Sequence, residues 1–143
     1  MDDRIHDGRS FRALLDGLGA DGPEGVRRRR VVAGALVAVA LLGPNVWGRA
    51  GVGTWFEVWI GVEDTLESAA LIVTAIFLAR RSRSVAWAGG VSLVLMLLGA
   101  LFQVMMAASG DNASYTALPM SLLLIKLPTV WVLSVLVRRG RQW

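Results

Sequence analysis

The chain contains no cysteine and only one histidine, His6, among its 143 residues. The lack of cysteine excludes disulfides, thiolate metal sites, iron–sulfur clusters and cysteine nucleophiles. The single histidine lies in the polar N-terminal segment, so a bis-histidine haem inside a bilayer is excluded too. The serine and threonine residues of the apolar region have no histidine near them in the sequence, which argues against hydrolytic catalysis. We therefore expect no metal, no cofactor and no enzymatic activity.

Charge is scarce and unevenly placed. Hydrophobic residues make up 55% of the chain and charged residues 18%, whereas an ordinary soluble domain has about 45–50% and about 25%. Residues 1–30 hold 13 of the 26 charged side chains, and residues 31–137 hold only 10. The basic residues flank apolar runs, which indicates membrane topology and not nucleic-acid binding. The excess of arginine over lysine, 14 to 1, suggests a GC-rich bacterial source.

Four apolar segments match the length of about 20 residues that a helix needs to cross a bilayer. They comprise residues 31–48, 55–79, 85–108 and 117–137. The connections between them are short, so consecutive helices are expected to be antiparallel neighbours. The sequence thus predicts an all-α, integral membrane four-helix bundle with up-down spans. Residues 1–30 then form a polar cytoplasmic tail, and residues 138–143 form a basic one.

The second segment contains four acidic residues, so its assignment needs an argument. If its acids stayed in water, only the 12 residues 68–79 would remain, or about 18 Å of helix against about 30 Å of hydrocarbon. A re-entrant loop would return three arginines to the outside, against the positive-inside rule. With four spans and both termini inside, 13 of the 15 basic residues are cytoplasmic. The arginines expected to anchor this topology are Arg27, Arg28, Arg29, Arg30, Arg80, Arg81, Arg83, Arg138, Arg139 and Arg141.

The N-terminal region leaves two questions open. A cleaved signal peptide is a rival for the first span, because residues 27–30 are basic and small residues follow the apolar stretch, although the basic run begins late for such a signal. Phe11, Leu14, Leu15 and Leu18 recur at i, i+3, i+4 and i+7, which predicts a short amphipathic helix. It would lie on the inner leaflet or dock on a partner, or the segment would be a loosely ordered tail.

The acidic residues of the second span share one face. At 100° per residue, Glu57, Glu63, Asp64 and Glu67 fall within one arc of about 120°. A charge at mid-bilayer costs at least about 2.5–3.5 kcal/mol, so this face is expected to point into the bundle. Glu57 lies at the rim and the other three lie deeper.

The single lysine lies at the same depth as one of these acids. Glu67 is 13 residues from Arg80 and Lys126 is 12 residues from Arg138, so both are about 18–20 Å from the cytoplasmic boundary. We predict that Lys126 pairs with Glu67. Together with Glu63 and Asp64, these residues make up what we call the intramembrane charge cluster.

Other polar residues are expected to line a cavity next to this cluster, and a proline is expected to shape it. The candidate lining residues are Glu57, Thr74, Gln103, Ser121 and Thr129. Pro128 follows Lys126 closely and is expected to kink the helix and free a carbonyl near the cluster.

Two functions fit this pattern. In the first, the charge pair fixes helix register, and the protein is a non-enzymatic subunit, scaffold or accessory of a membrane assembly. In the second, the acids take up a cation or proton and Lys126 competes with it, as in a small oligomeric ion-coupled transporter or channel. An intramembrane enzyme and a pore-forming lysis protein rank lower. The expected location is a bacterial inner membrane, with the lipid bilayer, further copies or other membrane subunits as partners.

Overall fold

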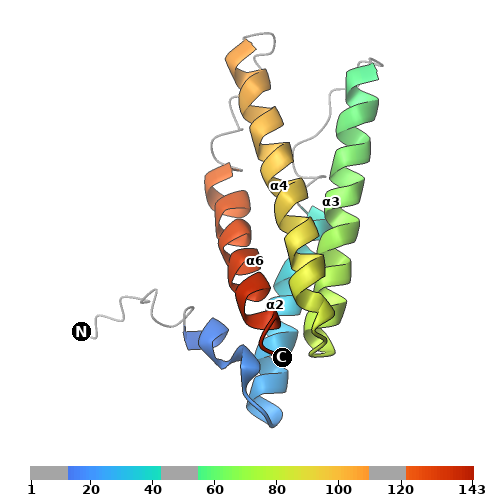
Figure 1. The fold of residues 1–143 in the computed structure, drawn as a ribbon. Coiled ribbons are helices and arrows are strands. Elements are labelled where there is room, and N and C mark those ends of the chain that lie inside the picture. Colours follow the sequence, from blue (N-terminus) through green and yellow to red (C-terminus); the bar gives the residue numbers. More distant parts are fainter. Residues whose placement is uncertain (1–12, 43–54, 110–121) are drawn as a thin grey trace, which may run out of the picture.

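The computed structural model describes residues 13–42, 55–109 and 122–143. This part of the chain is helical and contains no strand, so the all-α prediction is confirmed. Its long helices run side by side and antiparallel in Figure 1: α2 (Pro23–Leu42), α3 (Trp55–Ala79), α4 (Ser84–Ser109) and α6 (Leu127–Gly140). Two short elements accompany them: the 3₁₀ turn η1 (Gly17–Gly19) and the π-helical turn η3 (Leu122–Lys126), which leads directly into α6.

Helix α2 begins at Pro23, within the segment that the sequence assigned to the polar tail. Gly22 has φ +90°, a conformation that glycine adopts at no steric cost, and reverses the chain just before the helix. Proline is favoured in the first helical turn because its missing N–H has no intrahelical partner there, and Glu24 complements the helix dipole. The arginine run that follows is therefore helical. The sequence-based prediction began the first span at residue 31 because it counted only the apolar residues.

A tight turn joins α3 to α4 and makes them antiparallel. The N–H of Arg81 donates to the carbonyl of Leu78 at 3.1 Å, and the N–H of Ser82 donates to that of Phe77 at 2.9 Å. Arg81 itself has φ 51°, in the left-handed region. These bonds make a Schellman motif, which satisfies the last carbonyls of α3.

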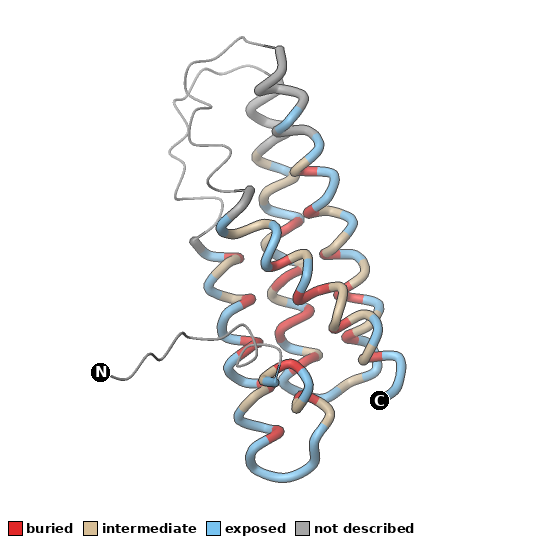
Figure 2. The backbone as a smooth tube through the Cα atoms, turned by 90° about the vertical axis from the view of Figure 1, so that its left-hand side faces the viewer, coloured by how far each residue is buried: buried red, intermediate tan, exposed pale blue. Residues whose placement is uncertain are grey.

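The helices pack through small and branched apolar residues. The fully buried side chains of the long helices include Leu71, Leu78, Val85, Met96, Leu133 and Leu136. Two hydroxyl groups add links between helices: Ser68 Oγ donates to the carbonyl of Ala40 at 2.9 Å, and Thr74 Oγ1 lies 2.9 Å from Ser92 Oγ. Figure 2 shows the buried positions on the sides of the helices that face one another.

The outer surface is unusually apolar. On α4, four aliphatic side chains in succession along the outer face are more than half exposed: Val94, Leu97, Leu98 and Leu101. Trp87 near the start of α4 is 73% exposed. Among the apolar residues of the interior lie a few buried polar side chains, namely those of Glu67, Thr74, Ser92 and Thr129.

Among the described helices, α4 alone is long and apolar enough to cross a membrane on length and composition, over Ser84–Leu101 with a mean hydropathy of 2.0. The other long helices differ from it for visible reasons. Helix α2 begins with the arginine run, α3 carries the acidic residues, and α6 has 14 residues. The four-span membrane bundle expected from the sequence is therefore not confirmed by the structure, and it stays a proposal.

Candidate functional site

The structure brings Lys126 and Glu67 together. Lys126 is the last residue of η3, and Glu67 lies in the middle of α3. The Nζ atom of Lys126 is 3.3 Å from Oε2 of Glu67, at hydrogen-bond and ion-pair distance. Each side chain is 12% exposed, so the pair is nearly closed off. Removing one partner of such an enclosed pair strongly destabilises the folded protein, because the other charge stays buried without compensation.

Glu63 lies one turn along α3 from Glu67 and packs against α4 at Gly99. A Cβ atom built on Gly99 would overlap Oε1 of Glu63 and would lie 3.1 Å from Nζ of Lys126. A larger residue at this position would displace the carboxyl end of the Glu63 side chain. Sequence reasoning did not identify Gly99 as part of this site, because a single small residue in a helix indicates at most a close helix contact.

The ammonium group of Lys126 has two carboxyl groups close to it, those of Glu67 and Glu63. Glu63 interacts electrostatically with Lys126, Glu67 and Asp64, so the single ammonium group faces more than one carboxyl group. Oε1 of Glu63 is buried and has no hydrogen-bond partner in the described part of the chain. A buried carboxylate oxygen without a partner is costly and favours a proton or a cation nearby.

The backbone next to Lys126 has unusual geometry. Pro128 has no N–H, so the carbonyl four residues earlier cannot receive its α-helical hydrogen bond. The chain forms the π-helical turn η3 at this point, and α6 resumes after it. Thr129 is buried and its hydroxyl donates to the carbonyl of Ile125 at 2.7 Å. Lys126 therefore sits where the helix changes its winding, a feature that is frequent at functional sites.

Of the other predicted cavity residues, Thr74 lies apart from this group and the rest cannot be placed relative to it. The hydroxyl of Thr74 is buried and is engaged with Ser92 and with the carbonyl of Ala70, each at 2.9 Å. Glu57 lies in α3 and Gln103 in α4. Their side chains, and Ser121 as a whole, lie outside the described residues.

At the other end of the bundle, residues 13–21 form a segment that we call the strap. It is helical over residues 13–16 and continues into η1. Leu15 and Leu18 are 1% and 0% exposed and belong to the core. The leucines of the predicted amphipathic helix thus pack on the protein's own helices, whereas Phe11 lies outside the described residues.

Arg29 of α2 binds the backbone of the strap. Its Nη1 donates to the carbonyls of Leu18 and Ala20, at 2.9 and 3.1 Å. The residue is 5% exposed, and its Nε has no hydrogen-bond partner among the described residues. Gly25 allows this approach, because a Cβ there would overlap the carbonyl of Ala20.

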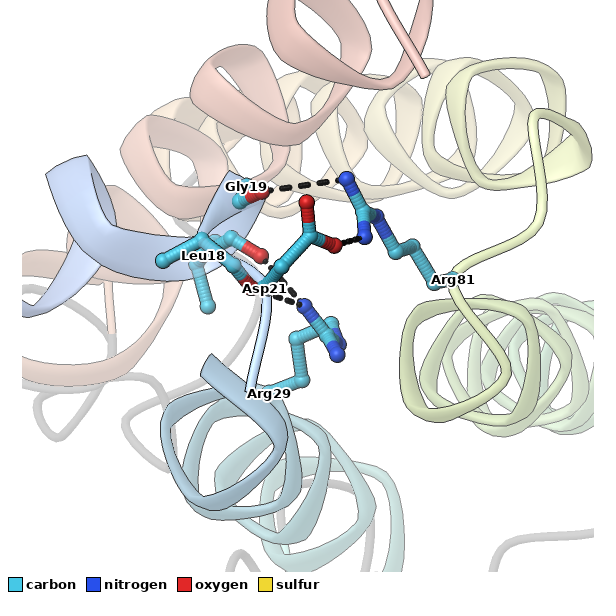
Figure 3. A network of polar contacts seen from close by, with 6 residues as sticks. Leu18, Gly19, Asp21, Arg29 and Arg81 are labelled. Atoms are coloured by element: carbon cyan, nitrogen blue, oxygen red, sulfur yellow. Dashed lines mark hydrogen bonds and ion pairs between the residues drawn. The ribbon is translucent and has the colours of Figure 1, made fainter. Parts of the chain in front are cut away.

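Two further arginines hold the strap from other elements. Arg81, in the α3–α4 turn, donates to the carbonyl of Gly19 at 3.1 Å and pairs with Asp21. Figure 3 shows Arg29 and Arg81 reaching this stretch of the strap from separate elements. Arg139, near the end of α6, donates to the carbonyl of Leu15 at 2.7 Å and pairs with Asp16. Three elements therefore clamp one short segment.

The ten arginines expected to anchor topology thus divide into two groups. Arg28 also reaches the strap, donating to the carbonyl of Ala13 at 3.1 Å, and pairs with Glu24. The second group is exposed and makes no hydrogen bond or ion pair with the strap within the described residues; it comprises Arg27, Arg30, Arg80, Arg83, Arg138 and Arg141. The sequence did hold a signal for Arg29, which lies three, four and seven residues before the buried Val32, Ala33 and Leu36.

In the part of the chain that the structure describes, no group of three or more acidic, histidine or cysteine residues is placed to hold a metal ion. Comparisons with protein families, with curated proteins and with solved structures gave no match to this chain. Function must therefore be argued from the charge cluster, the clamp and the polarity of the surface.

Proposed function

We propose that this chain is a four-span membrane bundle with both termini on the cytoplasmic side, acting as a non-catalytic subunit, scaffold or accessory of a membrane assembly. The observation that carries the proposal is the apolar outer surface of the bundle together with the charge pair enclosed inside it. Leu97, Leu98 and Leu101 face outward on α4, while Glu67 and Lys126 are enclosed. Water disfavours such a surface, whereas hydrocarbon or an apolar partner accommodates it.

The closed charge pair supports a structural role for the bundle. Lys126 and Glu67 contact each other directly and leave little surface to solvent. An enclosed pair of this kind specifies which faces of two helices meet. The strap supports the orientation, because it gathers arginines of three elements at one end, and basic residues accumulate on the cytoplasmic side.

The topology can be tested with single cysteines, because the natural chain has none. Ser82→Cys lies in the α3–α4 turn, and Ser114→Cys lies between the third and fourth proposed spans. In intact cells an impermeant maleimide should label only Ser114→Cys, and Ser82→Cys should react only after the membrane is opened. Labelling of both from the same side would overturn the four-span proposal, as would release of the chain by an alkaline carbonate wash.

The subunit role needs a separate measurement. Purified from its native membrane in mild detergent, the protein should have a protein mass well above the 15.4 kDa of one chain in light scattering corrected for detergent. Glu67→Leu combined with Lys126→Leu should keep this mass if the pair only fixes register. A monomer as the sole species would contradict the subunit role.

Glu63 favours a second candidate function, ion-coupled transport. Its buried Oε1 has no partner among the described residues and lies beside Lys126, so a proton or a cation would complete the site. In this function the ammonium group and the transported ion compete for the same carboxylates.

Proteoliposome flux separates the two functions. A pH-dependent cation or proton flux that is lost in Glu63→Gln and Glu67→Gln would favour transport. Glu24→Gln is the matched control, because Glu24 pairs with Arg28 at the exposed end of α2. A wild-type protein that carries no flux under any gradient would eliminate the second candidate.

A further inference from the structure

A pocket of about 450 Å³ lies between the strap and the end of α6. It is lined by Asp16, Gly19, Arg138, Arg139, Gln142 and Trp143. This volume exceeds what an inorganic ion needs and falls in the range of small-molecule sites. It is separate from the intramembrane charge cluster, which lies at the opposite end of α6, near Lys126.

The pocket offers one uncommitted positive charge. Arg139 is already engaged, through Asp16 and the carbonyl of Leu15. Arg138 is exposed and makes no hydrogen bond or ion pair within the described residues. Since Asp16 and Arg139 pair with each other, Arg138 is the charged side chain of the lining that is left to bind an anion. A planar guanidinium group binds phosphate oxygens in a forked geometry.

The remaining walls suit the atoms around a phosphate group. Gln142 supplies an amide that can donate hydrogen bonds. The indole of Trp143 is half-buried and packs toward the strap, where its Nε1 would lie 3.4 Å from a Cβ on Gly19. Tryptophan prefers the headgroup level of a bilayer, and anionic lipids are concentrated in the cytoplasmic leaflet.

We propose that this pocket binds the phosphate headgroup of an anionic phospholipid of the inner leaflet, through Arg138 with Gln142 and Trp143. This inference rests on the proposed membrane placement, which puts the pocket at the headgroup level. The same chemistry would accept a soluble phosphate monoester, so lipid and soluble probes have to be compared.

The experiment uses the full chain in a neutral detergent and native mass spectrometry. The probes are dioctanoyl phosphatidylglycerol, dioctanoyl phosphatidylcholine and glycerol phosphate. We expect the wild type to retain phosphatidylglycerol at least about tenfold more tightly than the other two. Arg138→Gln should weaken this binding about tenfold, as loss of one charge-assisted hydrogen bond does.

Arg83→Gln is the matched control, because Arg83 is exposed near the α3–α4 turn and does not line the pocket. It should bind phosphatidylglycerol as the wild type does. Equal losses of phosphatidylglycerol affinity in Arg138→Gln and Arg83→Gln would show that the lipid binds to basic surface residues in general, and would overturn the proposal. Binding of glycerol phosphate as tight as that of the lipid would overturn the lipid assignment. Lipid binding is measured on purified protein in detergent, whereas the membrane topology is tested by cysteine labelling in cells. A negative result in one experiment is therefore distinguishable from a negative result in the other.

Discussion

Nζ of Lys126 lies 3.3 Å from Oε2 of Glu67, although the two residues are 59 positions apart in the chain and belong to different helices. Because both side chains are nearly enclosed, each charge depends on the other for its stability. The neighbouring Glu63 adds a second carboxyl group to the same ammonium group.

Lys126→Leu should destabilise the protein by about 3–5 kcal/mol, because it leaves buried carboxylates without a positive partner. Adding Glu67→Leu should recover part of this loss, and only part, since Glu63 stays in place. Thermal unfolding in detergent, followed by circular dichroism, measures both effects. If the double variant is no more stable than Lys126→Leu alone, Lys126 and Glu67 do not form an energetically coupled pair.

Gly99→Ala should lower stability by no more than about 1 kcal/mol, because its Cβ would overlap Oε1 of Glu63 and the flexible end of that side chain would have to move. Gly90→Ala, on the same helix, has nothing within 4 Å of the new Cβ. It should instead raise stability by about 0.5–1 kcal/mol through helix propensity. Equal changes in the two variants would show that Glu63 does not occupy this position.

Thr74→Val and Ser92→Ala each remove one member of a fully buried hydroxyl pair. Each change should cost about 0.5–1.5 kcal/mol. Their combination should cost less than the sum, by at least about 0.5 kcal/mol, because the shared bond is lost only once. Strict additivity in a double-mutant cycle would mean that the bond between α3 and α4 adds nothing to stability.

Arg29→Gln should loosen the strap, because the carbonyls of Leu18 and Ala20 lose the guanidinium donor. Amide hydrogen exchange of the strap, measured by mass spectrometry, should become about tenfold faster. Arg30→Gln is the control, because Arg30 is exposed and makes no hydrogen bond or ion pair within the described residues. Faster exchange in both variants would argue that the strap responds to charge in general.

Arg81 combines a left-handed backbone with side-chain contacts to the strap. Arg81→Ala and Arg81→Gly lose the same contacts, so strap exchange should accelerate equally in both. Stability should differ, because alanine bears a cost of about 1–2 kcal/mol in this conformation that glycine avoids. Denaturation midpoints that place Arg81→Ala at or above Arg81→Gly would contradict this account of the turn.

Helix positions could be predicted well where composition changes sharply. The segment 55–79 coincides with α3, and 85–108 nearly coincides with α4, because charged or polar residues follow both segments in the sequence. The boundaries of α2 and α6 depend on backbone hydrogen bonding, which a prediction from the length of apolar segments does not take into account. Pro23 can start a helix within a polar stretch, and Pro128 introduces a π-helical turn where the sequence suggested a kink.

The sequence by itself determined an all-helical chain with its few inner charges on α3 and beside Pro128, because helical period and apolar length are local properties. The same local reasoning matched the depths of Glu67 and Lys126. Only the tertiary structure decided that Arg29 turns inward to the strap and that Gly99 makes room for Glu63. These outcomes depend on how helix faces meet. A run of four arginines or one small residue does not indicate which distant segment it will contact.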